Sequence, residues 1–229
     1  MTSSVLPREW DSTFFGARIF EAHLGGDSVE RVVAEAKQAG AECLYLFIEA
    51  ADLRGIEEAV RAGARLVDLR TELGGRLEVD RGVQATRSAT PSDREALLPQ
   101  TRELAIESRF SRDARIPEEK VREMYEIWLD RCLDEGVVAV PTAGRAGFVG
   151  ARKDGNVARI ELVYVDAASR GRGLGRALVR EAVSGVATSE ATVVTQIGNV
   201  AAQRLYQSLR LRSRSTSAVL HVWLDERSG

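Results

Sequence analysis

A glycine-rich segment between a β-branched run and a helical pattern holds the residues best suited to bind an anion. The segment reads Arg170-Gly171-Arg172-Gly173-Leu174-Gly175-Arg176. The first amides of a helix have no intrahelical acceptor and lie at the positive end of the helix dipole, so they can donate hydrogen bonds to a diphosphate. Glycines leave these amides uncovered and permit unusual backbone torsions. The segment therefore predicts a diphosphate-binding loop that opens a helix.

The spacing of these glycines differs from that of the common nucleotide-binding loops. Residues 170–176 lack the Lys-Ser/Thr pair of a P-loop, and the third glycine comes one residue too early for the Gly-x-Gly-x-x-Gly fingerprint. Taken alone, the segment also fits a glycine-rich helix start without any ligand.

A second pattern lies about thirty residues further along, after the apolar run 192–197. Residues 199–206 read Asn-Val-Ala-Ala-Gln-Arg-Leu-Tyr, which places Asn199 at the expected N-cap of a helix and Tyr206 two turns into it. An isolated tyrosine at such a position is more typical of a core aromatic whose hydroxyl has found a partner.

Together, the patterns Arg170-x-x-Gly173-x-Gly175 and Asn199-x-x-Ala202-x-x-x-Tyr206 resemble two signatures of the GNAT acetyltransferase superfamily. The resemblance implies an α/β fold with a mixed sheet, acetyl-CoA as co-substrate and a small-molecule amine as acceptor. It also implies that residues 170–176 hold the diphosphate and that Asn199 and Ala202 contact the CoA arm. In that reading Tyr206 is the general acid that protonates the departing thiolate.

Aminolysis of a thioester needs a neutral amine, a stabilised oxyanion and a proton for the thiolate. A β-bulge in the strand 160–165 would supply backbone amides to the thioester carbonyl. Strand alternation places Glu161, Val163 and Val165 on one face. If Val163 and Val165 line the acetyl group, Glu161 is a candidate general base, acting directly or through water. A paired or solvated charge is the alternative for Glu161.

Composition is that of a protein with a sizeable core and no nucleic-acid footprint. The chain has 229 residues, 44% of them hydrophobic, and a net charge of −2. No apolar run approaches the length of a membrane span and the N-terminus does not resemble a signal peptide, so we expect a cytoplasmic protein. The two cysteines and two histidines suggest neither a metal site nor a disulfide framework.

Periodicity and turn residues divide the chain into a small α/β domain, 1–82, and an acetyltransferase domain, 83–229. The first is a β-α-β-α-β unit, with strands at 18–24, 42–49 and 65–73 and helices at 28–38 and 51–62. The second has helices at 92–108, 117–135 and 174–187, strands at 137–141, 146–153 and 157–165, a strand from 192, the Tyr206 helix and a closing strand at 217–224. No internal repeat is evident.

Three flanking segments, residues 9–16, 108–110 and 194–199, resemble the TDP-fucosamine acetyltransferase family. Its members acetylate the 4-amino group of a TDP-linked deoxyamino sugar, so the resemblance implies such an acceptor, with Arg109 and Gln196 as candidate contacts. The aromatic residues of the first segment, Trp10, Phe14 and Phe15, are interpreted as core residues.

The chain departs from this family at two places, because Leu205 replaces an arginine and Arg210 replaces a C-cap glycine. We expect the Tyr206 helix to end by a route other than a left-handed residue. The sequence leaves two alternatives for the function open. The acceptor is another small amine, such as an aminoglycoside or amino acid, or the chain is a non-catalytic acyl-CoA-binding module. The oligomeric state is also left open, with a homodimer as one possibility.

Overall fold

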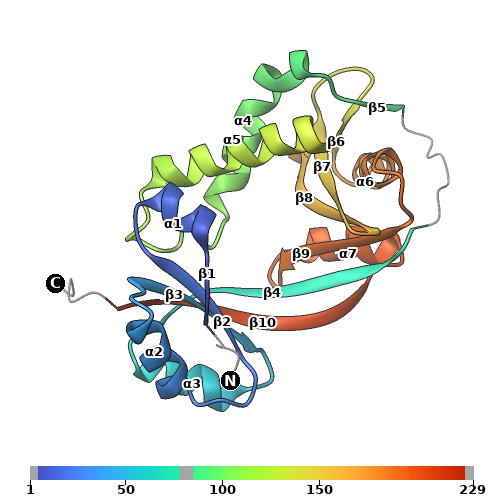
Figure 1. Cartoon of the computed structure of the whole chain (residues 1–229). Helices are drawn as coiled ribbons and strands as arrows, with labels where there is room; N and C mark the ends of the chain where they lie inside the picture. Colours follow the sequence, from blue (N-terminus) through green and yellow to red (C-terminus); the bar gives the residue numbers. More distant parts are fainter. Residues whose placement is uncertain (1–4, 78–84, 225–229) are drawn as a thin grey trace. The chain divides into compact units, whose positions relative to one another are not determined.

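Ten strands and seven α-helices make up the described part of the chain, residues 5–77 and 85–224 of the computed structural model. They form two compact units (Figure 1). The first contains the described residues up to 70, residues 112–116 and those from 215; the second contains the rest. The predicted domain boundary at 82/83 lies outside the described residues.

The ten strands form one mixed sheet, and the first unit holds the strand order β1-β2-β3-β10-β4 within it. Strand β2 is parallel to β3, and β10 is antiparallel to β3. Its elements are β1 (Val5–Pro7), α1 (Glu9–Phe15), β2 (Ile19–Leu24), α2 (Val29–Gln38), β3 (Cys43–Glu49), α3 (Leu53–Arg61) and parts of β4 (Arg65–Arg76) and β10 (Arg212–Trp223).

Helices α2 and α3 pack in one hydrophobic cluster with the strands of the first unit, where Val32 and Ala59 meet Leu44 and Leu46. Both helices begin at a side-chain cap, since Ser28 accepts from the Arg31 amide and Asp52 accepts from the Gly55 amide. The sequence predicted α2, α3, β2, β3 and β4 within a few residues of their observed bounds.

A buried hydrogen-bonded group joins residues 112–116 to β10 within the first unit. Asp113 accepts from His221 Nδ1 at 2.6 Å and from Trp223 Nε1 at 2.9 Å. Burial acts to raise the pKa of Asp113, but these hydrogen bonds and one from the Arg115 amide lower it below its usual value. The histidine is therefore part of the core of this unit.

The second unit holds the strand order β10-β4-β9-β8-β7-β6-β5. Its further elements are β5 (Thr86–Ser88), α4 (Arg94–Ile106), α5 (Glu118–Glu135), β6 (Gly136–Pro141), β7 (Gly147–Asp154), β8 (Val157–Val165), α6 (Leu174–Gly185), β9 (Glu190–Gln196) and α7 (Val200–Ser208), with short 3-10 turns at Pro91–Asp93 and Ala167–Ser169.

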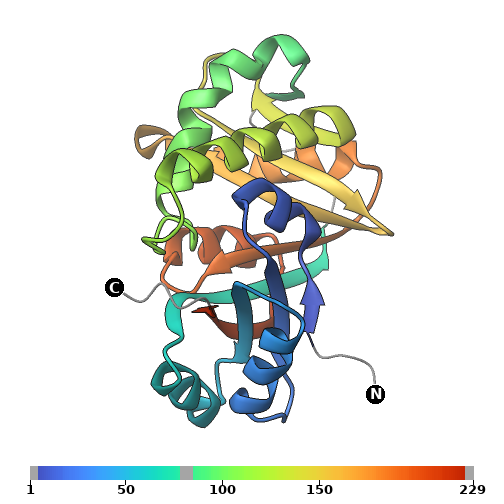
Figure 2. The ribbon, with the colours of Figure 1, turned by 60° about the vertical axis from the view of Figure 1, so that its left-hand side comes forward.

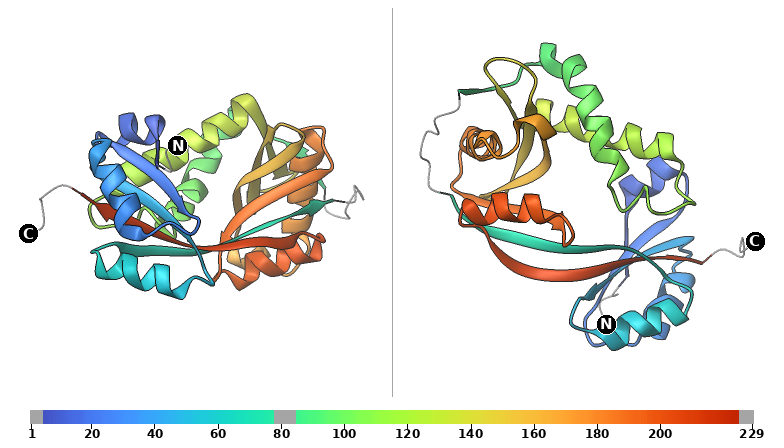
Figure 3. Two further views of the ribbon diagram at one scale, coloured as in Figure 1. Left: turned by 60° about the horizontal axis from the view of Figure 1, so that its bottom comes forward. Right: turned by 180° about the vertical axis from the view of Figure 1, so that it is seen from behind.

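Helices cover both faces of this part of the sheet. Helices α4 and α5 pack against one face, in a cluster that includes Cys132, Phe148 and Leu162 (Figure 2). Helices α6 and α7 pack against the other, with Val149 and Ile160 (Figure 3). Neighbouring residues of β7 and β8 alternate between the two clusters, as a pleated sheet requires. The predicted α/β class with a mixed sheet is confirmed.

Three features of the first and last elements differ from expectation. Strand β1 and helix α1 were not predicted, and β10 begins at Arg212 rather than at 217. The interpretation of the N-terminal aromatics as core is wrong for Trp10, which is 39% exposed and stacks on Phe14 with ring centroids 4.9 Å apart, whereas Phe14 and Phe15 are half-buried. None of the helices in the described ranges has the length and apolarity needed to cross a bilayer.

Candidate active site

The loop before α6 presents open backbone at the start of a helix. Gly171 and Gly173 have φ values of 76° and 84°, in the left-handed region, and no heavy atom lies within 4 Å of a Cβ placed on either. Gly173 is the N-cap, and the first helical bond runs from the Ala177 amide to its carbonyl at 3.2 Å. The amides of residues 174–176 thus precede the helical hydrogen bonds, and the glycine cap has no side chain to occupy them.

Gly175 brings α6 close to both α7 and β8. A Cβ at this glycine would lie 3.2 Å from Leu205 and 3.6 Å from Val165. Arg170 secures the other end of the loop, because its Nε donates to the Val165 carbonyl at 3.0 Å. The loop, the end of β8 and the helix α7 therefore converge at one place.

Strand β8 contains a β-bulge at Glu161. On β7 the neighbours Gly150 and Ala151 pair with Leu162 and Ile160, so Glu161 is the extra residue. Such an extra residue is not part of the regular ladder of hydrogen bonds, and it changes the direction in which the neighbouring side chains point. The bulge expected in this strand is present.

Pairing between β8 and β9 ends beside the bulge. Among the described residues, the parallel ladder joins 157–160 to 190–193 and does not continue beyond Ile160 and Val193. The last part of β8, residues 161–165, therefore has backbone groups free of β9 on the way to the glycine loop. An extended ligand can pair with such a strand edge.

Glu161 does not share a face with Val163 and Val165, so that expectation is wrong. Its carboxylate takes hydrogen bonds from Arg152 Nε at 3.1 and 3.2 Å, and Cys132 Sγ of α5 lies 3.6 Å away. Val163 and Val165 instead pack on the cluster of α6 and α7. The physical reason is the bulge, which interrupts the alternation at that residue.

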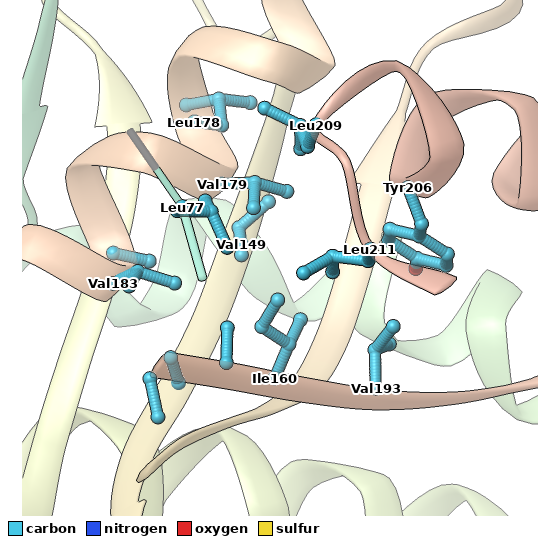
Figure 4. Close-up of a cluster of buried hydrophobic side chains, with 14 of the residues drawn as sticks. Leu77, Val149, Ile160, Leu178, Val179, Val183, Val193, Tyr206, Leu209 and Leu211 are labelled. Atoms are coloured by element: carbon cyan, nitrogen blue, oxygen red, sulfur yellow. The ribbon is translucent and has the colours of Figure 1, made fainter. Parts of the chain in front are cut away.

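Tyr206 is buried in that cluster, with 3% of its surface exposed. Figure 4 shows its ring beside Leu211 and Val193. Burial raises the pKa of Tyr206 above its usual value. Leu174 belongs to the same cluster, and Val163, Val165 and Ala202 pack against it. The structure thus brings these five predicted site residues together.

Asn199 caps α7, since its side-chain oxygen accepts from the Ala202 amide at 3.0 Å. The helix ends in a left-handed residue, Arg210, with φ 66°. The expectation of another route is therefore wrong, and the arginine adopts the torsion that a glycine would take at lower cost.

Gln196 is the last residue of β9, and Arg109 lies in the segment that follows α4. The Gln196 amide nitrogen donates to the carbonyl of Glu107, two residues before Arg109. The Arg109 guanidinium lies 4.2 Å from the ring centroid of Phe110, which makes an edge contact with Trp128 of α5. These two candidates are thereby brought close to one another.

Sequence reasoning missed the partners of the site residues. Arg152 and Cys132 hold Glu161, and Glu103 of α4 accepts a hydrogen bond from Tyr164 at 2.6 Å, which together with burial raises the pKa of Tyr164. No local spacing could have revealed them, because each pair joins different elements. Within residues 5–77 and 85–224, no group of three or more His, Cys, Asp and Glu is arranged to hold a metal ion.

An open helix N-terminus, beside a parallel strand pair that separates at a bulge, is the arrangement of an acyl-CoA-dependent acetyltransferase. Residues 98–210 match the model of the acetyltransferase (GNAT) family. The chain is therefore a GNAT-family acetyltransferase, and members of this family use acetyl-CoA.

Solved structures share this fold at low sequence identity. A GCN5-related N-acetyltransferase from Sphaerobacter thermophilus is 18% identical, with a TM-score of 0.58 over 91% of this chain and 73% of its own. One from Kribbella flavida is 15% identical, with a TM-score of 0.56 over 89% and 80%. A conserved protein of unknown function from Staphylococcus epidermidis is 8% identical, with a TM-score of 0.66 over 91% and 86%. No match was found among curated proteins.

Proposed function

We propose that this enzyme transfers an acetyl group from acetyl-CoA to a primary amine by direct attack on the thioester. The observation that carries the proposal is the separation of β8 from β9 at the Glu161 bulge, directly before the open N-terminus of α6. The acyl-CoA ligand supplies an activated acetyl thioester to this place.

The loop fits a diphosphate on structural grounds. Two glycines with left-handed torsions leave room where a Cβ would stand, and the helix N-terminus has amides to donate. Arg170, Arg172 and Arg176 add positive charge around the same loop. These residues would hold the diphosphate, with Asn199 and Ala202 against the CoA arm.

The remaining roles fall to residues around the bulge. Backbone amides released from the ladder at Glu161 would donate to the thioester carbonyl as negative charge develops there. Tyr206 would donate its proton to the departing thiolate, because a tyrosine hydroxyl is protonated at neutral pH. Val163 and Val165 would line the acetyl group.

Glu161 is the proposed general base, acting through water. Its side chain is 18% exposed, and the hydrogen bonds from Arg152 Nε hold the carboxylate in place. Because it faces α5 rather than α6, we place the approach of the amine on the α5 side of β8.

For the acceptor we propose a nucleotide-linked amino sugar. Support comes from the segments 108–110 and 194–199, which carry the resemblance and which the Gln196–Glu107 hydrogen bond holds together. Arg109 would bind the acceptor's diphosphate and Gln196 would lie beside its amino group. We further propose that the enzyme is cytoplasmic and homodimeric.

Two measurements test the proposal. Thermal shift with acetyl-CoA should raise the melting temperature of the wild type and leave that of Gly173→Val unchanged. A thiol-release assay over TDP-amino sugars, aminoglycosides and amino acids should give the highest kcat/KM for a TDP-linked amino sugar. Arg109→Gln should raise KM for that sugar and leave KM for acetyl-CoA unaltered. Preference for an amine without a diphosphate would refute the acceptor assignment while leaving the acetyltransferase intact.

A further inference from the structure

Two runs of the chain have the same element lengths at a constant separation. Strand β3, helix α3 and strand β4 begin at residues 43, 53 and 65, and β9, α7 and β10 begin at 190, 200 and 212. Each difference (190 − 43, 200 − 53, 212 − 65) is 147, and the ends of the three elements repeat it. Helices α2 and α6 also end 147 residues apart, at 38 and 185, and α6 is two residues longer at its start.

Backbone details repeat at the same separation. The N-caps Asp52 and Asn199 have φ, ψ values of −82°, 70° and −83°, 71°, and both accept from the amide three residues later. Left-handed torsions occur at Gly40 and Gly63 in the first run and at Ala187 and Arg210 in the second. Such agreement in caps and helix ends goes beyond a shared βαβ topology.

Sheet topology repeats as well. Each run starts with a parallel strand pair, β2 with β3 and β8 with β9. In the strand order each pair is followed by the long strand of the other run, β10 after β3 and β4 after β9. In each unit the two helices of the run lie in one cluster with their strands. Element lengths, caps and strand pairing therefore repeat along the chain, although no repeat is evident in the residue types.

We infer that the first unit is another copy of the acyl-CoA-binding half of the fold and that it has lost its acyl-CoA site. We call the copy in the first unit the first copy and the copy in the second unit the second copy. One chain therefore binds one acyl-CoA. The inference rests on the proposed function only in placing acyl-CoA at residues 170–176.

The charge of residues 25–31, the loop of the first copy that is equivalent to residues 170–176, is unfavourable for binding a diphosphate. Counted back from the start of each helix, Gly26 with φ 92° corresponds to Gly171 with φ 76°, and Ser28 corresponds to Gly173. Residues 170–176 carry three arginines and no acidic residue, whereas residues 25–31 carry two acidic residues and one arginine. A diphosphate that the second loop attracts is repelled by the first.

At the start of α2, in the first copy, a backbone amide already has a hydrogen-bond acceptor. The Ser28 hydroxyl accepts from the Arg31 amide at 3.2 Å, so one of the amides that a phosphate would use is already bonded. In the second copy the glycine at this position makes no side-chain cap. The same helix position is thus capped in one copy and open in the other.

A hollow of about 280 Å³ remains at the corresponding place in the first unit. Its walls include Asp27, Asp52 and Glu58, which bond to Arg31, the Gly55 amide and Arg54 respectively. These carboxylates face the space in which an acyl-CoA would need donors. Ala59 stands where the second copy has Tyr206, so the proposed acid is missing as well.

Isothermal titration of the full chain with CoA tests the inference, using matched glycine variants of the two loops. We expect one CoA per chain for the wild type. Gly171→Val should weaken binding at least tenfold, and Gly26→Val should retain wild-type affinity. Two CoA per chain, or a loss from Gly26→Val equal to that from Gly171→Val, would overturn the inference.

Thermal melting of the same two variants provides a readout without ligand. Both glycines have left-handed torsions with open space around them, so a valine should lower the melting temperature by the same amount at each. Unequal falls would contradict the equivalence of the loops. If the wild type bound no CoA, the proposed function would fail, and these melting temperatures would still decide whether the two runs are copies.

Discussion

At the scale of single residues, the position of Tyr206 in its helix could be predicted from the sequence, but the residues that surround its side chain could not. The sequence predicted a tyrosine two turns into a capped helix, and α7 has that form. Its burial among Val193, Leu209 and Leu211 depends on a strand and on a chain segment outside that helix. The partners of Glu161 escaped prediction for the same reason, because Arg152 lies on a neighbouring strand.

Replacing Tyr206 by phenylalanine should lower kcat about 10²- to 10⁴-fold, the usual contribution of a general acid. KM for acetyl-CoA should stay close to the wild-type value, because the hydroxyl's bond strengthens only as charge builds on sulfur. Steady-state kinetics with a thiol-release assay provides the measurement. Tyr45→Phe, a buried tyrosine of the first unit, is the matched control and should leave both constants unchanged. Undiminished kcat in Tyr206→Phe would make Tyr206 a core aromatic of an enzyme that uses another acid.

Replacing Glu161 by glutamine should lower kcat by about 10²-fold or more, because the amide cannot take up the proton that a general base removes. Steady-state kinetics at a pH where the acceptor amine is neutral provides the measurement. Cys132→Ala removes the sulfur near the same carboxylate and should keep the wild-type rate. A Glu161→Gln enzyme with the wild-type rate would show that the ion pair with Arg152 only stabilises the bulge.

At the scale of elements, the sequence located β8 and α6 well because alternation and glycines are local signals. The expected strand 157–165 has the observed bounds, and the expected helix begins at Leu174 as observed. The position of the bulge could not be predicted, because it is set by where Gly150 and Ala151 of β7 pair. That one residue turned the side chain of Glu161 to the α5 side of the strand.

The helix ends of the two copies allow a stability test. Ala187 follows α6 with φ 56°, whereas its counterpart Gly40 follows α2 with φ 81°. A left-handed torsion costs an L-residue about 1–2 kcal/mol, partly offset by the extra freedom of glycine in the unfolded chain. Ala187→Gly should therefore stabilise the protein by about 0.5–1 kcal/mol, and Gly40→Ala should destabilise it by a similar amount. Chemical denaturation measures both; a loss of stability in Ala187→Gly would mean that the exposed turn is not strained.

At the scale of the whole molecule, the repeat escaped prediction because the copies share backbone geometry and not residue types. Equivalent positions pair Asp52 with Asn199, Ala59 with Tyr206 and Gly63 with Arg210. Local periodicity also assigned β4 to a separate first domain. Its second half belongs instead to the second unit, where Leu73 and the adjoining Leu77 are buried with Tyr206 and Leu211.

A fragment of residues 83–229 should consequently fail to fold alone. It lacks Leu73 and Leu77, which are 1% and 3% exposed in the cluster that contains Tyr206, and it lacks the strand between β9 and β10 in the sheet. Loss of two buried leucines costs about 2–5 kcal/mol each even when only the side chain is removed, which approaches the whole stability of a domain. Circular dichroism and thermal melting of the purified fragment should show no cooperative transition.

Co-expression supplies the control for this experiment. Residues 1–82 produced as a separate chain carry β4 and both leucines, so they should associate with 83–229 and restore cooperative melting and CoA binding. Association would show that the fragment 83–229 fails to fold because it lacks β4, and not because truncation damages it in some other way. A lone 83–229 fragment that melts cooperatively and binds CoA with the affinity of the full chain would contradict the argument, because the core around Tyr206 would then be complete without β4.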